Sequence, residues 1–161
     1  KAHWHFIGQI QSNKTRAIAT HFDWVHSLAS EKIARRLNNQ RESLPPINVL
    51  FQINVSNDPA KGGVAAERVS ELLDQVKDMP NLKPRGLMTI AENSKDLDVL
   101  RRYFAKIRIL LQDLSATHAL EDFDQLSMGM TADLEPAITE GATIVRVGTA
   151  IFGQRNNKEQ Q

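Results

Sequence analysis

The sequence predicts an α/β protein in which a parallel β-sheet carries helices on its outside. Short apolar segments alternate with longer amphipathic ones, and the links between them are short. The length of 161 residues suits one domain with a hydrophobic core. Six segments are expected to be strands, at residues 4–7, 24–28, 49–55, 87–90, 125–128 and 143–147. Five are expected to be helices, at residues 14–22, 31–41, 69–76, 97–114 and 133–138.

The strand predictions rest on short apolar runs that end at turn residues. Trp4–Ile7 stops at Gly8, and Thr143–Val147 stops at Gly148. Val49–Val55 is a nearly continuous apolar run, which is typical of a strand covered on both faces.

The helix predictions rest on apolar residues repeated at helical spacing and on capping residues. One stripe consists of Val69, Leu72, Leu73 and Val76, at i, i+3, i+4 and i+7. Ser30 can cap the helix at residues 31–41, and Asp133 can cap the short helix that follows it. Pro136 is tolerated there because it lies in the first turn.

Two folds share this alternation, an open doubly wound sheet and a closed eight-stranded (β/α)₈ barrel. No G-x-G-x-x-G turn follows an early strand, as a dinucleotide-binding fold requires. The six expected strands are two fewer than a barrel contains. From the pattern alone, both folds stay open.

The composition narrows the function classes. Lys and Arg number 20 against 19 acidic residues, so no basic excess indicates a nucleic-acid partner. The chain contains no cysteine, which excludes disulfides and thiolate chemistry. No run approaches the roughly 18 apolar residues needed to cross a membrane, and no secretory signal opens the sequence. We therefore expect a cytoplasmic protein with no membrane partner.

The most informative candidate site lies in the loops after the last two expected strands. They are Ser127–Thr131 and Arg146–Thr149. Glycines let the backbone N–H groups approach a phosphate, and (β/α)₈ barrels commonly bind phosphate at these two loops. Arg146 lies in an otherwise apolar segment, where a buried guanidinium needs an anion or another acceptor. The alternative, ordinary turns with Arg146 paired to a carboxylate, stays open.

Other candidates carry weaker signals. His5 reads more readily as a core histidine than as an acid–base group. Met88 and Met130 suit a flat ring but also suit a core, and Asn54 near a strand end suits a turn as well as a site. Lys61–Gly63 is expected to be a flexible loop. Tyr103 is expected to lie far from the chemistry.

Four motifs, in order, resemble the pyridoxal phosphate homeostasis protein family. Trp4–Lys14 is similar to its W-H-F-I-G-x-L-Q-x-N-K signature, and Arg85–Ile90 to its R-G-L-M-x-I segment. Leu126–Asp133 resembles L-S-M-G-M-S-x-D, and Gly141–Gly153 resembles the family's closing segment. The resemblance implies the alanine racemase N-terminal type of (β/α)₈ barrel, with only about strands 3 to 8 present. It implies a partial barrel domain at residues 1–155 and a polar, frayed tail at 156–161.

The same resemblance implies that pyridoxal 5′-phosphate (PLP) binds at the barrel mouth. Ser127, Met128, Gly129, Gly148 and Thr149 align with the phosphate-binding loops. Arg146 aligns with the arginine beside the cofactor, and two further positions line the pocket, Met88 and Phe6.

One part of the family pattern is missing. The Schiff-base lysine belongs to an A-V-S-K segment on the first barrel strand, and this chain contains no such segment. Lys14 and Lys61 lie in other motifs, so no catalytic residue is assigned. We therefore expect an N-terminally incomplete barrel, and whether this chain alone holds PLP stays open.

The resemblance implies a non-catalytic PLP-binding protein in vitamin B6 and amino-acid balance, with PLP-dependent enzymes as further partners. One alternative is a PLP-dependent amino-acid racemase, but those enzymes add a second domain and a tyrosine base. Another is an inactive barrel fragment or a phosphate-binding barrel unrelated to PLP. An open barrel edge would also favour self-association.

Overall fold

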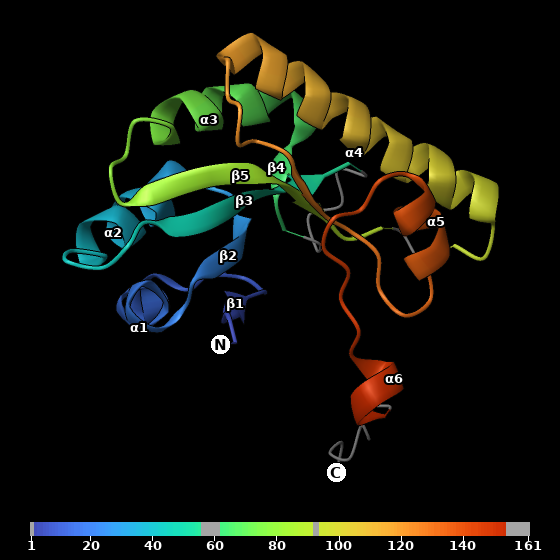
Figure 1. Ribbon diagram of the computed structural model, residues 1–161, viewed down its shortest axis with the longest axis horizontal. Helices are drawn as coiled ribbons and strands as arrows, with labels where there is room; N and C mark the ends of the chain where they lie inside the picture. Colours follow the sequence, from blue (N-terminus) through green and yellow to red (C-terminus); the bar gives the residue numbers. More distant parts are fainter. Residues whose placement is uncertain (1, 56–61, 92–93, 154–161) are drawn as a thin grey trace.

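The computed structural model describes residues 2–55, 62–91 and 94–153, and its centre is a parallel β-sheet (Figure 1). Five strands follow one another across the sheet in chain order: β1 (His5–Phe6), β2 (Trp24–Leu28), β3 (Ile47–Asn54), β5 (Leu82–Thr89) and β6 (Gln125–Ser127). Strand order does not reverse, as it would in a doubly wound sheet. The arrangement is that of a partial (β/α)₈ barrel, which confirms the predicted fold class.

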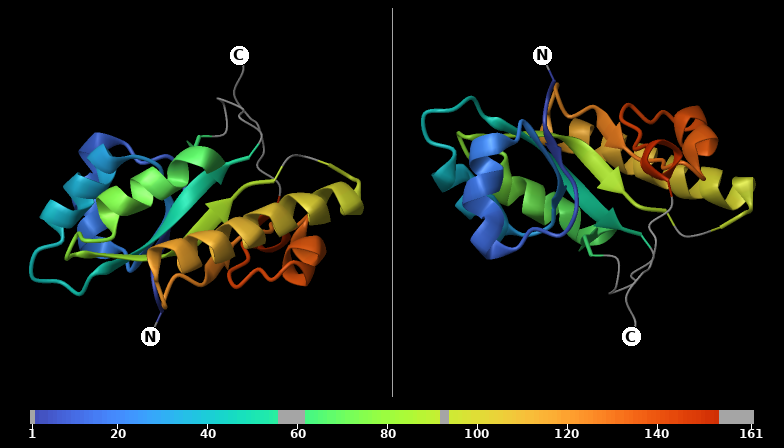
Figure 2. Two further views of the ribbon diagram at one scale, coloured as in Figure 1. Left: turned by 90° about the horizontal axis from the view of Figure 1, so that it is seen from above. Right: turned by 90° about the horizontal axis from the view of Figure 1, so that it is seen from below.

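The helices lie outside the sheet, and the first five pack against its outer face. They are α1 (Thr15–His21), α2 (Glu31–Gln40), α3 (Val69–Val76), α4 (Leu97–His118), α5 (Leu134–Thr139) and α6 (Thr149–Phe152), with short 3₁₀ turns at Ser12–Lys14 and Ala66–Arg68. Seen from above, α3 and α4 lie in front of β3 and β5 (Figure 2). No helix in the described ranges is both long and apolar enough to cross a lipid bilayer.

The predicted caps act at two helix starts in different ways. The Ser30 hydroxyl accepts the Ile33 N–H at 3.4 Å, as the sequence predicts for α2. Asp133 precedes α5 as expected, but its carboxylate accepts the N–H of Met130 instead of one from the helix. The carboxylate therefore stabilises the loop before α5.

The hydrophobic core lies between the sheet and the helices. Val49, Phe51 and Ile53 of β3 point into it, together with buried residues of α1 to α5. The alternate residues Leu50 and Gln52 therefore point to the inner, concave face. Both faces of β3 are buried along most of its length, as its continuous apolar run predicts.

Strand β5 begins five residues earlier than the expected strand at residues 87–90. Pro84 lies inside it, where proline is normally excluded. Only β3 pairs with Leu82–Pro84, and the register shifts between Pro84 and Gly86, so Arg85 bulges out. The proline is accommodated because the pairing with β6 begins only at Gly86 and because the bulge adjusts the pairing with β3.

The predicted strand at residues 143–147 is wrong. Only Ile144 forms a bridge, to Ser127, because β6 ends at Ser127 and Gly129 turns the chain away with a φ of 92°. The sixth strand of the sheet is instead β4 (Val64–Ala65), which pairs with the end of β3 and which the sequence did not indicate.

Two further predictions lie outside the described residues. They are the polar tail at residues 156–161, with the domain boundary at residue 155, and Lys61 of the expected flexible loop. They stay predictions.

Candidate functional site

A cavity of about 550 Å³ opens where β1, β5 and β6 end. This is the carboxyl-terminal edge of the sheet, where barrels of this kind bind ligands. The lining is mostly aliphatic, with a few polar groups, which is typical of a small-molecule site. The cavity is lined by His5, Ile7, His26, Ile90, Met130, Ile144, Val145, Arg146, Val147 and Gly148.

Arg146 supplies the positive charge of the cavity. Its guanidinium donates hydrogen bonds to Ser127 O (2.9 Å), Ser127 Oγ (2.8 Å) and Thr89 O (2.8 Å). Burial lowers its pKa, an effect that the nearby Asp133 opposes. Within the described ranges, no carboxylate forms an ion pair with Arg146, so its partners are neutral acceptors. These hydrogen bonds hold the guanidinium in place.

A row of hydrogen bonds joins Arg146 to two histidines. Ser127 Oγ lies 2.8 Å from His26 Nδ1, and His26 Nε2 lies 2.8 Å from His5 Nδ1. The pKa of His26 is lowered to about 4, mainly by burial and also by His5 and Arg146. Burial also lowers the pKa of His5, as does His3, while Asp23 raises it. Both imidazoles are therefore neutral at neutral pH.

The two predicted loops lie side by side. Arg146 N–H donates to Gly129 O (3.0 Å), and Met128 N–H donates to Ile144 O (3.1 Å). The hydroxyl of Thr149 contacts that of Thr131 at 3.3 Å. Met128 N–H is thus occupied, whereas in the described part of the chain no acceptor bonds the N–H of Gly148 or Thr149.

The predicted site residues do not all lie at the cavity. Arg146 and Gly148 line the cavity, and Ser127 is bonded to Arg146. Met128 lies in the hydrophobic core between the sheet and the helices. Phe6 packs against this core, and its ring centroid lies 5.4 Å from that of Phe22.

Met88 lies on the inner face beside Ser127, its register partner in β6, but it is buried below the cavity lining. Among the weaker candidates, Met130 and His5 line the cavity, while Asn54 lines a separate one of about 420 Å³.

Sequence reasoning missed His26. A sequence signal was present, because alternation along the strand predicted at residues 24–28 places His26 on the same face as Trp24. In the structure the ring of Trp24 stacks on that of His5, with centroids 5.4 Å apart. Tyr103 also lies nearer the site than expected. Its hydroxyl contacts Thr89 Oγ1 at 2.7 Å, and Thr89 O is an acceptor for Arg146.

The fold and site together define a barrel segment of the alanine racemase type, with a cavity at its carboxyl edge that the Arg146 guanidinium lines. The family model of the alanine racemase N-terminal domain matches residues 1–156. The pyridoxal phosphate homeostasis protein of Pseudomonas aeruginosa is 53% identical over 154 residues, which are 95% of this chain and 65% of that protein. The Escherichia coli K12 protein of the same name is 43% identical, with the same coverage.

Solved structures agree. PipY of Synechococcus elongatus superimposes with a TM-score of 0.87 at 35% identity, covering 94% of this chain and 71% of that one. Its structure with PLP bound gives a TM-score of 0.85 at 34% identity, covering 94% and 70%. Alanine racemase of Clostridium difficile gives 0.75 at 14% identity, covering 98% and 41%, which shows a shared fold alone.

The chain therefore belongs to the alanine racemase N-terminal domain family, within its group of pyridoxal phosphate homeostasis proteins. This confirms the resemblance carried by the four motifs. The chain spans 65% of the length of the Pseudomonas relative.

Proposed function

We propose that this chain binds PLP without catalysing a reaction on it, and so takes part in PLP homeostasis and amino-acid balance. The observation that carries the proposal is Arg146, a guanidinium without an ion-pair partner in the described part of the chain. It lies beside two adjoining loops, in a cavity of about 550 Å³. The names of the relatives and the PLP-bound structure of PipY support the same ligand.

The residues of the cavity fit the chemistry of PLP, which combines an anion with a flat ring. The N–H groups of Gly148 and Thr149 and the Thr149 hydroxyl would hold phosphate oxygens. The side chains of Ile90, Met130 and Val147 would pack on the ring. Arg146 would lie beside the pyridine nitrogen or the phosphate. When bound, PLP supplies an electrophilic aldehyde.

The proposal assigns no second base to this site, in contrast to a racemase. Tyr103 is the chain's one tyrosine, and its hydroxyl is bonded to Thr89 and to Ile90 O rather than lining the cavity. A chiral amino-acid assay with added PLP separates the two functions. Sustained racemisation by the purified protein would contradict the non-catalytic proposal.

Titration of the chain with PLP, followed by absorbance and calorimetry, tests the binding itself. Replacing Arg146 by glutamine should weaken binding roughly 10- to 100-fold, because a charge-assisted hydrogen bond contributes about 1.5–3 kcal/mol. Arg35→Gln is the matched control, since it removes the same charge from an exposed pair with Glu31. Equal affinities in all three proteins, or no binding by the unaltered chain, would refute the assignment.

The proposed partners follow from the proposed ligand. PLP-dependent enzymes would receive PLP from this protein, in the cytoplasm. A PLP-free apoenzyme is incubated either with the PLP-loaded protein or with an equal concentration of free PLP exposed to a phosphatase. The PLP-loaded protein should restore the activity of the apoenzyme faster. Self-association through the apolar edge of the sheet is a further proposed contact.

A further inference from the structure

A hydrogen-bonded row crosses the concave face of the sheet above β3 and β5. It runs from His5 on β1 through His26 on β2 and Ser127 on β6 to Arg146. Because β3 and β5 lie between β2 and β6 in the sheet, the His26–Ser127 bond joins two strands that are not neighbours. Three members of the row, His5, His26 and Arg146, line the cavity.

The donors and acceptors along the row constrain one another. A guanidinium can only donate, so Ser127 Oγ accepts from Arg146. A neutral imidazole carries one N–H and one bare nitrogen, so His26 donates at one end of its ring and accepts at the other. The protons can run toward His5 or toward Ser127. In both arrangements His26 fixes the rotamer of Ser127, whose oxygen faces Arg146.

Two further contacts make Arg146 sensitive to Ser127. The same Nη1 atom that bonds Ser127 Oγ also bonds Ser127 O, while Nη2 bonds Thr89 O. A rotated Ser127 hydroxyl would leave Nη1 with one acceptor of its present two. The guanidinium plane would then be free to tilt about its remaining bonds, and a misplaced donor costs affinity.

We propose that His26 is a positioning residue, which acts through Ser127 to fix the Arg146 guanidinium in the geometry that receives the anionic ligand. The inference rests on the proposed PLP site and deepens it. His26 itself is 1% exposed, and its two ring nitrogens are both engaged. Its contribution therefore comes through the row rather than from a direct charge.

A matched pair of substitutions separates positioning from simple filling of space. The amide of asparagine can occupy the place of the imidazole Nδ1, and the longer amide of glutamine the place of Nε2. His26→Asn should keep the hydrogen bond to Ser127, whereas His26→Gln should keep only the hydrogen bond to His5. PLP should bind the His26→Asn protein within about threefold of the unaltered chain and the His26→Gln protein roughly tenfold more weakly. Equal losses in both variants, or no loss in either, would overturn the proposal.

A second readout needs no ligand. The side-chain N–H signals of Arg146 in ¹H–¹⁵N NMR spectra should be sharp and protected from exchange in the unaltered chain. They should persist in His26→Asn and broaden in His26→Gln. If the two variants give identical Arg146 signals, His26 does not position the guanidinium. If the unaltered chain fails to bind PLP, the proposed function fails, and the Arg146 signals still decide the role of His26.

Discussion

At His26 the folded protein keeps a histidine neutral. Its pKa is lowered from 6.5 to about 4, first by burial and then by His5 and Arg146. Between these two pH values the His26 imidazole is protonated in the unfolded chain but neutral in the folded protein. A rise in pH over this range therefore favours the folded state. The stabilisation is complete above pH 6.5 and is lost as the pH falls toward about 4. It amounts to about 3 kcal/mol, since one pKa unit corresponds to about 1.4 kcal/mol.

Urea unfolding at a series of pH values measures this effect. The free energy of unfolding should fall between pH 6.5 and about 4, more steeply for the unaltered chain than for His26→Asn. The comparison matters because His5, beside His26, also faces His3 and Asp23 and contributes its own slope. Parallel curves for the two proteins would mean that His26 is not the titrating group.

Gly129 is required by the backbone of the first loop. Its φ is 92°, and an added Cβ would lie 2.6 Å from the Cβ of Ala137 in α5. Gly129→Ala should therefore lower the free energy of unfolding by about 1–3 kcal/mol, through strain and crowding. Gly148→Ala is the matched control in the second loop, since nothing lies within 4 Å of its added Cβ. Denaturant unfolding of both variants checks the difference, and equal stabilities would contradict it.

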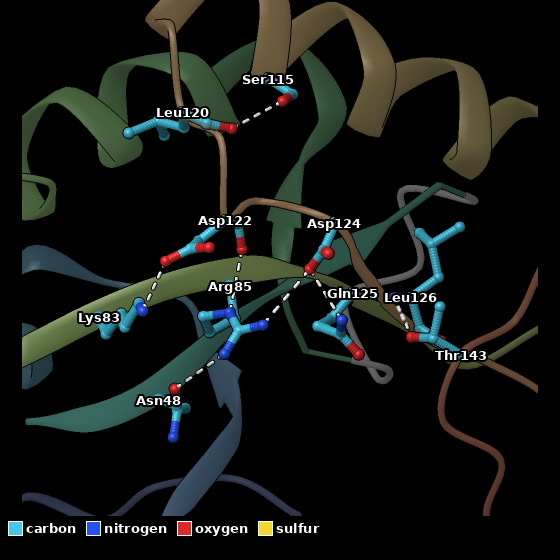
Figure 3. A network of polar contacts seen from close by, with 10 residues as sticks. All are labelled: Asn48, Lys83, Arg85, Ser115, Leu120, Asp122, Asp124, Gln125, Leu126 and Thr143. Carbon is cyan, nitrogen blue, oxygen red and sulfur yellow. Dashed lines mark hydrogen bonds and ion pairs between the residues drawn. The ribbon is translucent and has the colours of Figure 1, made fainter.

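At the scale of elements, a polar network ties the start of β5 to the segment that leads into β6 (Figure 3). Arg85 donates from Nε to Asp122 O at 2.9 Å and lies 5.4 Å from the ring centroid of Trp24. Its side chain is 21% exposed. Beside it, Lys83 pairs with Asp122 at 2.6 Å, but both side chains of that pair are largely open to solvent.

The two cations should therefore differ in importance. Arg85→Ala should destabilise the protein by about 1–2 kcal/mol, because it removes a hydrogen bond, a cation–π contact and packing on Trp24. Lys83→Ala should cost less than about 0.5 kcal/mol, since exposed ion pairs contribute little. Thermal unfolding of the two variants measures both values. A larger loss from Lys83→Ala would reverse this ranking.

At the scale of the whole molecule, the three most exposed large apolar side chains of the described residues lie beside β1 and in α6. Trp4 next to β1 is 65% exposed, and Ile151 and Phe152 of α6 are 68% and 85% exposed. Exposed apolar side chains and unpaired strand edges favour association. Figure 1 shows α6 projecting away from the sheet and its helices.

Sedimentation at increasing concentration tests self-association. The mean mass should rise with concentration and should rise less when Ile151 and Phe152 are both replaced by serine. Ile109→Ser is the control, since Ile109 is exposed on α4, away from either end of the sheet. A monomer at all concentrations would rule out this contact.

Local patterns in the sequence predict most of the helices and strands. The alternation of apolar runs and amphipathic stripes predicts α1 to α5 but not the short α6. Ser30 marks the start of α2 because a cap depends on residues close in the chain. The strand at residues 143–147 fails for the opposite reason. A strand exists only if its neighbour continues alongside it, and β6 stops at Ser127.

The candidate site divides in the same way. Glycines, hydroxyls and Arg146 at the ends of the last segments are visible in the chain and point to an anion before any coordinates are known. The fold alone brings His26 to Ser127, which lies 101 positions away in the sequence. It also gives Arg146 neutral acceptors, with no carboxylate partner among the residues that the structure describes. Residue types and spacing encode local preference, whereas contacts across the concave face arise only after the sheet has curved.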